Sequence, residues 1–243
     1  AMLGRFEEAE TLCEKALRSA LKVNSVYSMG WAEVNYSYLY MHRGDGQNTV
    51  AHAQKAISYI DEAQALIIMG LARTVLGMGY YFLGNLGTAR AYIEQGIKIH
   101  TDTGMPFLLS LQYYFLSTVF LNSDDLPNAQ SCAEKALDLS QTNREKHFEG
   151  RSWALLGRVM SKTNPSQSGK AEEFILRGIN ILDQLKTRPW CAEGYLYLGE
   201  LHSETGHREK ALEYLNKAKE MFQDMKMEYW LDRTHKALSA LSI

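Results

Sequence analysis

Apolar residues along this chain recur at intervals of three and four, the spacing that places them on one face of an α-helix. The segment of residues 62–83, EAQALIIMGLARTVLGMGYYFL, shows this pattern at Leu76 and Tyr80. A second helical segment, LGTARAYIEQGIKIH, follows at residues 86–100. A turn beginning at Gly84 separates the two segments. The pattern therefore predicts a helical hairpin, whose two members we call helix A and helix B.

The hairpin repeats along the chain with a nearly constant period. Three series of small residues each advance in steps of 40, 40, 40, 42 and 40 residues. Two series lie in helix B: Ala16, Ala56, Gly96, Ala136, Gly178, Ala218, and Ala9, Thr49, Ala89, Ala129, Ala171, Ala211. The third lies in helix A: Ser37, Gly77, Ser117, Gly157, Gly199, Ser239. The longer step falls at TNPSQSG, residues 163–169, which predicts a longer loop there.

Small residues at fixed positions in both helices indicate places where two helices cross closely. A larger side chain there would force the backbones apart. We therefore expect Gly77, Gly157 and Gly199 to be buried at helix crossings. His202 stands where the preceding units carry a large apolar residue, and we interpret it as a half-buried histidine with its polar groups satisfied.

The register predicts an all-α chain of about twelve helices, stacked as a right-handed superhelix of antiparallel hairpins. A lone helix B occupies residues 1–20, five hairpins occupy residues 21–223, and a terminal helix A occupies residues 224–243. We expect one solenoid domain, 1–243, and a fragment of a longer chain, because the first and last helices lack their hairpin partners. The first helix would then offer Phe6 and Leu12 to a neighbour, which is either the missing part of the chain or a second copy, in a homo-oligomer formed through this exposed N-terminal end.

Charge and cysteine content narrow the class of protein. The net charge is −2 for 243 residues, which gives no electrostatic reason to expect nucleic acid or a membrane surface as a partner. Cys13, Cys132 and Cys191 are odd in number and far apart, so they favour a reducing cytoplasm over a disulfide framework. The most apolar run, residues 105–121, is short for a bilayer span and is interrupted by Ser and Gln.

Motifs that carry chemistry are missing from the sequence. It has no phosphate-binding GxxxxGK[ST], no dinucleotide-binding pattern and no HExxH. His202 and His207 straddle a turn, which is poor geometry for a shared metal. We therefore expect no enzyme activity, no catalytic residues, no cofactor and no metal site.

The small-and-large spacing resembles the tetratricopeptide repeat. The segment YLYLGELHSETGHREKALEYLNKAKEMF, residues 195–222, places Gly199, Gly206, Ala211 and Ala218 on the signature positions of that family. A period near 40 exceeds the usual 34 of the family. This long repeat is similar to the repeats in the helical arms of bacterial multidomain signalling ATPases, including those joined to adenylate cyclases. It is also similar to the repeats in the arms of regulators like the maltose activator.

The resemblance implies a binding groove lined by helix A residues outside the signature positions. In this chain these positions include Trp31, Tyr38, Met41, Met78, Tyr81, Phe82, Tyr114, Arg151 and Arg158. Aromatic and Met side chains are typical anchors for partners. An apolar stretch of a partner would contact the aromatic positions, and its acidic end would meet the two arginines. The alternative is that the longer helices bury these side chains as core.

Two functions follow from the resemblance. The first is a non-catalytic scaffold arm of a signalling or regulatory protein, which binds a peptide or protein segment in the groove. The alternative is an arm that senses a ligand or a signal peptide for a transcriptional regulator or a cyclase.

Overall fold

The structure is a computed structural model that describes residues 1–241. It contains twelve α-helices and no strand within these residues. The helices are α1 (Phe6–Lys22), α2 (Val26–Arg43), α3 (Gly46–Glu62), α4 (Leu66–Phe82), α5 (Leu86–Asp102), α6 (Leu109–Asn122), α7 (Leu126–Thr142), α8 (Lys146–Thr163), α9 (Ser168–Gln184), α10 (Arg188–Glu204), α11 (Arg208–Asp224) and α12 (Glu228–Ala240). The all-α fold and the helix number predicted from the repeat are confirmed. None of these helices is both long and apolar enough to span a membrane.

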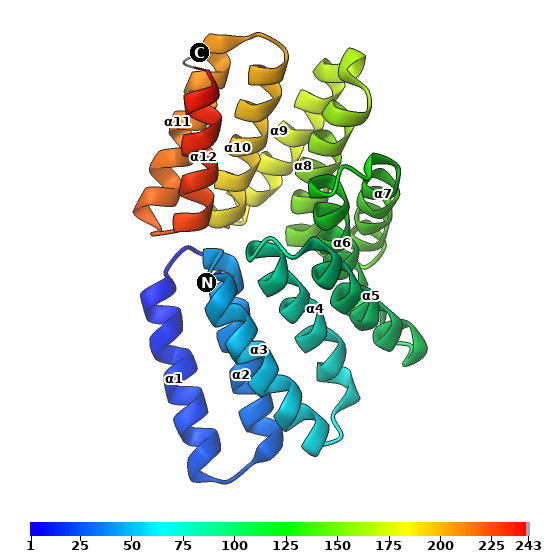
Figure 1. Ribbon diagram of the computed structural model, residues 1–243, viewed down its shortest axis with the longest axis vertical. Helices are drawn as coiled ribbons and strands as arrows, with labels where there is room; N and C mark the ends of the chain where they lie inside the picture. The colour runs from blue at the N-terminus through cyan, green and yellow to red at the C-terminus, as the bar shows by residue number, and fades with distance from the viewer. Residues whose placement is uncertain (242–243) are drawn as a thin grey trace. The chain divides into compact units, whose positions relative to one another are not determined.

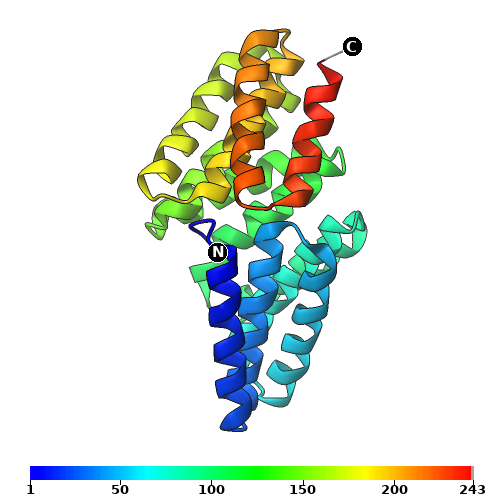
Figure 2. The ribbon, with the colours of Figure 1, turned by 90° about the vertical axis from the view of Figure 1, so that its left-hand side faces the viewer.

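The chain divides into two compact units. Unit 1 comprises Ala1 and Arg5–Val119, and unit 2 comprises Met2–Gly4 and Phe120–Ile243. Within each unit, neighbouring helices pack side by side, as Figures 1 and 2 show for α1, α2 and α3 in unit 1 and for α10, α11 and α12 in unit 2. The single solenoid domain predicted for residues 1–243 stays a prediction.

The predicted crossings at small residues are present in both units. A Cβ atom added to Gly77 would lie 2.7 Å from the carbonyl oxygen of Ala89, and one added to Gly157 would lie 2.6 Å from that of Ala171. Gly199 is also buried, but its added Cβ would meet the flexible side chain of Leu215 at 2.5 Å. The burial of the three glycines is confirmed, and at Gly77 and Gly157 the backbones themselves are in near contact.

Each turn from helix B to the next helix A uses the same backbone motif. The second residue after the helix adopts a left-handed conformation, with φ between 51° and 65° at Asn24, Gln64, Gly104, Arg144, Lys186 and Lys226. The following N–H then donates to a carbonyl five residues back, as in Ser25 to Ala20 at 3.1 Å and Met227 to Phe222 at 3.0 Å. This is the Schellman arrangement, which satisfies the last carbonyls of the helix.

A buried polar network joins three helices of unit 1. The ring of fully buried His100 on α5 has Nδ1 at 3.1 Å from Oε1 of Gln112 on α6 and Nε2 at 3.1 Å from the carbonyl of Ile67. The Gln112 amide donates to Thr74 Oγ1 at 2.8 Å. Gly70 makes room for the ring, because a Cβ there would lie 2.5 Å from His100 Nε2.

The N-terminal helix is partly covered by the chain itself. Leu12 is 64% exposed, as expected for a face without a helix A beside it, but Phe6 is only 5% exposed. The expectation that Phe6 would lie open was wrong. Burying an aromatic ring is favourable, and here the chain's own packing achieves it.

Substituting Gly157 by Ala tests the crossing in unit 2. We expect a loss of about 1–3 kcal/mol, because the new methyl group meets backbone and not a movable side chain. Thermal unfolding should show a melting temperature lowered by several degrees.

The matched control is Gly169→Ala on α9. That position is exposed and has no atom within 4 Å of the added Cβ, so its melting temperature should stay unchanged or rise slightly. Equal melting temperatures for the two variants would contradict a close crossing at Gly157.

Candidate functional site

The nine groove residues predicted from the sequence lie on α2, α4, α6 and α8. Trp31 is 36% exposed, and Tyr38 and Phe82 are half-buried. The other six are between 3% and 6% exposed: Met41, Met78, Tyr81, Tyr114, Arg151 and Arg158. These six fit the alternative that such side chains are core, whereas the first three are accessible. Binding of a partner by any of the nine stays a prediction.

An ion-pair ladder joins three A helices of unit 2. Arg158 on α8 contacts Glu200 on α10 at 2.9 Å, and its two terminal nitrogens donate to the two carboxylate oxygens of Glu204 at 2.8 Å each. Arg233 on α12 approaches Glu200 to 2.9 Å. We call Arg158, Glu200, Glu204 and Arg233 the ladder. A partner carboxylate that meets Arg158, as the sequence suggests, would have to displace Glu204.

The ladder shifts the pKa values of its members. Burial by itself raises the pKa of Glu200, but the charges of Arg233 and Arg158 outweigh burial and hold the pKa below its usual value. The pKa of Glu204 is likewise lowered, because its hydrogen bond and ion pair with Arg158 outweigh burial. Burial opposes the charge of Arg158, yet Glu200 and Glu204 raise its pKa above the usual value. All three side chains are therefore charged at neutral pH.

Sequence analysis named Arg158 as a groove residue, and the same groove positions in the next hairpin are taken by Glu200 and Glu204. Arg158 and Glu200 each follow a residue of the helix A series by one position, and Glu204 follows by five, so the register places them on one face. Arg233 was missed. It precedes Ser239 by six positions, as Trp31 precedes Ser37, so extending the groove positions to the terminal helix would have found it.

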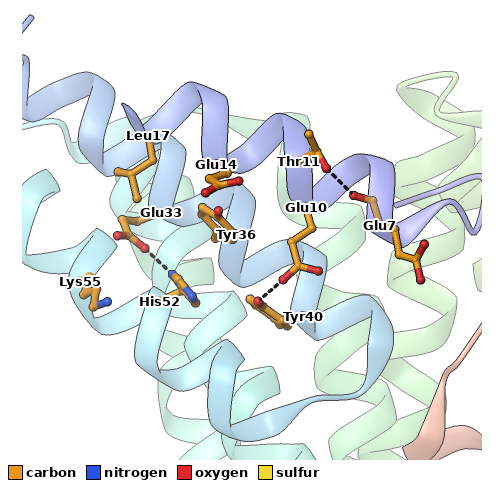
Figure 3. Close-up of a pocket in the computed structure, with 10 residues that line it drawn as sticks. All are labelled: Glu7, Glu10, Thr11, Glu14, Leu17, Glu33, Tyr36, Tyr40, His52 and Lys55. Atoms are coloured by element: carbon orange, nitrogen blue, oxygen red, sulfur yellow. Dashed lines mark hydrogen bonds and ion pairs between the residues drawn. The ribbon is translucent and has the colours of Figure 1, made fainter. Parts of the chain in front are cut away.

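Unit 1 contains a cleft of about 480 Å³ bounded by α1, α2 and α3, which we call the α1–α3 cleft (Figure 3). Its lining includes Glu7, Glu10 and Glu14 from α1 and Lys55 from α3. Figure 3 shows the three α1 carboxylates following one another along that helix. Sequence analysis did not find this site, because its residues come from three helices.

A histidine held by a buried carboxylate lies in this cleft. Nδ1 of His52 is 2.5 Å from Oε2 of Glu33, whose side chain is only 4% exposed. The imidazole stacks on Tyr36 at 4.7 Å and on Tyr40 at 5.4 Å between ring centres. These contacts fix the ring and its tautomer.

The hydroxyl of Tyr40 donates to Glu10 Oε1 at 2.7 Å and ties α2 to α1. Burial, then this hydrogen bond and the Glu10 charge, raise the pKa of Tyr40 to about 12. The tyrosine is therefore neutral at physiological pH and acts as a donor to the carboxylate.

His202, singled out in the sequence, is more buried than expected, at 3% exposure. Its Nε2 lies 3.2 Å from Glu172 Oε1, and its ring stacks on Tyr214 at 5.5 Å. Burial lowers its pKa, although the Glu172 charge acts in the opposite direction. These contacts describe a packed histidine that bridges α9, α10 and α11, but Nδ1 is buried without a hydrogen-bond partner among the described residues, so the expectation that both ring nitrogens are satisfied was wrong. No group of three His, Cys, Asp or Glu residues among residues 1–241 is arranged to hold a metal ion.

Replacing Glu200 by Gln tests the ladder. At pH 7 we expect a loss of about 3 kcal/mol, because the buried Arg158 and the partly buried Arg233 lose a shared counter-charge. The control Glu94→Gln breaks an exposed pair with Arg90 and should change stability by less than about 1 kcal/mol. Chemical denaturation of both variants measures the difference.

Lowering the pH should remove the difference in stability between the wild type and Glu200→Gln. The stabilisation from a carboxylate with a lowered pKa is present above its unfolded value, about 4.5, and is lost as pH falls through the folded pKa. The stability gap between wild type and Glu200→Gln should therefore shrink below pH 4.5. A gap that stays constant from pH 7 to pH 3 would show that Glu200 is not held ionised.

Comparison with known proteins agrees with this architecture. Residues 192–224, which cover most of α10 and all of α11, match the tetratricopeptide repeat. No curated protein sequence matches the chain.

Solved structures share the fold at low sequence identity. Aspartyl phosphate phosphatase F from Bacillus subtilis matches with a TM-score of 0.59 and 17% identity, over 91% of this chain and 62% of that one. A Rap protein complexed with competence and sporulation factor matches with a TM-score of 0.69 and 13% identity, over 84% of this chain and 58% of that one. A signal transduction ATPase with a tetratricopeptide repeat sensor, from Pyrococcus horikoshii, matches with a TM-score of 0.58 and 21% identity, over 95% of this chain and 36% of that one.

This chain therefore spans less than two thirds of the length of each of these three proteins. Residues 192–224 form a tetratricopeptide repeat, and the chain as a whole has the fold of the tetratricopeptide-like helical repeat proteins.

Proposed function

We propose that this chain is a non-catalytic interaction arm of a signalling or regulatory protein, which binds a peptide or protein segment along its A helices. The observation that carries the proposal is the accessible aromatic face of α2. Trp31 and Tyr38 are seven residues apart, two helical turns, so both lie on one side of α2. Trp31 is 36% exposed and Tyr38 is half-buried. Aromatic side chains that keep one accessible edge are the usual anchors for a bound segment.

The structural relatives support this proposal. One of them is a Rap protein in complex with competence and sporulation factor, so a protein of this fold holds a partner. The free cysteines and the lack of a disulfide among them suit the reducing cytoplasm that a signalling arm would occupy.

A second candidate is a sensing arm that passes the binding of a ligand or signal peptide to attached domains. The similarity to an ATPase that has a tetratricopeptide repeat sensor favours it. The two candidates differ in what a bound segment does: a scaffold only holds its partner, whereas a sensor changes the state of the rest of the protein.

Selection from a displayed peptide library tests the proposed groove. We expect the wild-type chain to enrich a family of peptides, and Trp31→Ala/Tyr38→Ala to lose them while keeping its melting temperature within a few degrees. Loss of two aromatic anchors should weaken binding by about a hundredfold.

The control is Tyr27→Ala, which removes a tyrosine of α2 that is 51% exposed and stands outside the groove positions. It should bind the same peptides as the wild type. Peptides that bind all three proteins equally, or a library that yields no enrichment, would count against a groove at Trp31 and Tyr38.

A further inference from the structure

The α1–α3 cleft differs from the equivalent places in the other hairpins of the same chain. The position of Glu33 is taken by Arg73, Tyr113, Trp153 and Tyr195, and that of His52 by Tyr92, Cys132, Phe174 and Tyr214. In unit 2 these positions are filled by packed rings, such as Trp153 with Phe174 at 4.7 Å and Tyr195 with Tyr214 at 6.2 Å. The fold therefore does not require a buried Glu–His pair here, and such departures are expected at functional sites.

The contents of the cleft favour a positively charged occupant. Four glutamates line it against one lysine and one histidine. Arg18 reaches Glu14 from outside the lining in an exposed pair, which contributes little. Arg43 reaches Glu10 in a half-buried pair at 3.6 Å, a longer contact than the Tyr40 hydrogen bond to the same carboxylate. A ligand cation can therefore compete for these carboxylates.

The arrangement of the carboxylates points to an extended organic cation and not to a metal ion. No three potential ligands among the described residues converge on a metal position. Glu7, Glu10 and Glu14 instead follow α1 at steps of three and four residues, which places them about 4.5 Å and about 6 Å apart along the helix axis. Amines separated by three and four methylene groups match this spacing. The volume of about 480 Å³ lies within the range of small-molecule sites.

We propose that the α1–α3 cleft binds a linear polyamine, with its amines along Glu7, Glu10 and Glu14 and its alkyl chain over the Tyr36 and His52 rings. The buried Glu33 carboxylate supports this arrangement by holding His52 in place and by adding negative charge beneath the ligand. This site is separate from the groove at Trp31 and Tyr38 and does not depend on peptide binding there.

Isothermal titration calorimetry with spermidine tests the proposal. We expect one site on the wild type, with an affinity that falls as salt increases. Glu10→Gln/Glu14→Gln should weaken binding by about tenfold, the effect of two exposed ion pairs together. The matched control Glu94→Gln/Glu134→Gln removes the same charge from exposed positions of α5 and α7, and it should bind as the wild type does.

A second variant separates binding from stability. Glu33→Tyr/His52→Tyr installs the ring pair that unit 2 carries at Tyr195 and Tyr214, so it should fold with an equal or higher melting temperature and bind no spermidine. If this variant does not fold, the affinity of Glu10→Gln/Glu14→Gln for spermidine decides whether the proposal holds.

Two results would overturn the polyamine assignment. One is spermidine binding that is the same in all variants and is displaced equally by Mg²⁺ at matched charge, which indicates a diffuse ion atmosphere. The other is a trilysine peptide that binds in a Glu10- and Glu14-dependent manner while spermidine does not, which would assign the cleft to a basic protein segment.

Discussion

The near contact between helix A and helix B, present at Gly77 and Gly157, is the constraint on which the rest of the structure depends. At Gly77 and Gly157 the added Cβ would strike a carbonyl oxygen of the opposing helix, so the backbone of helix B lies directly against helix A. This contact fixes the position of helix B along the axis of helix A within the hairpin. When the two helices have the same relative position in every hairpin, side chains 40 residues apart occupy equivalent places.

How much of the molecule could be predicted follows from this constraint. The helices and the burial of Gly157 were accessible from the sequence, because spacing within one helix and between repeats is visible there. The pairing of Arg158 with Glu204, 46 residues later, was not, because it depends on how neighbouring A helices are rotated. The contact of His100 with the Ile67 carbonyl was also hidden, because it depends on how α5 packs against α4. Tyr81 and Tyr114 share the chemistry of binding residues, and only three-dimensional packing reveals them as buried.

Charge is distributed differently in the two units. Unit 2 pairs the buried Arg158 with Glu200 and the more exposed Glu204, so an incoming carboxylate must replace existing ion pairs, which makes that face rigid and selective. Unit 1 concentrates carboxylates on α1, where Glu14 is about half exposed and can rearrange. The first arrangement favours a preformed surface, and the second favours an adaptable one. The equivalent positions of the other repeats show which residue types the fold accepts. A residue that differs from all its equivalents is therefore explained by function and not by the fold.

The Schellman turns between hairpins have an evolutionary consequence. The hydrogen bonds that define these turns join backbone atoms, and the left-handed position holds Asn24, Arg144 and Lys226 as well as Gly104. No side chain is needed to close the turn, so these six sites can drift after a repeat is duplicated without loosening the stack. Hairpins joined in this way can be added, removed or exchanged by recombination at the turns. A protein family whose hairpins are connected by such turns can change its number of hairpins faster than it changes its core residues.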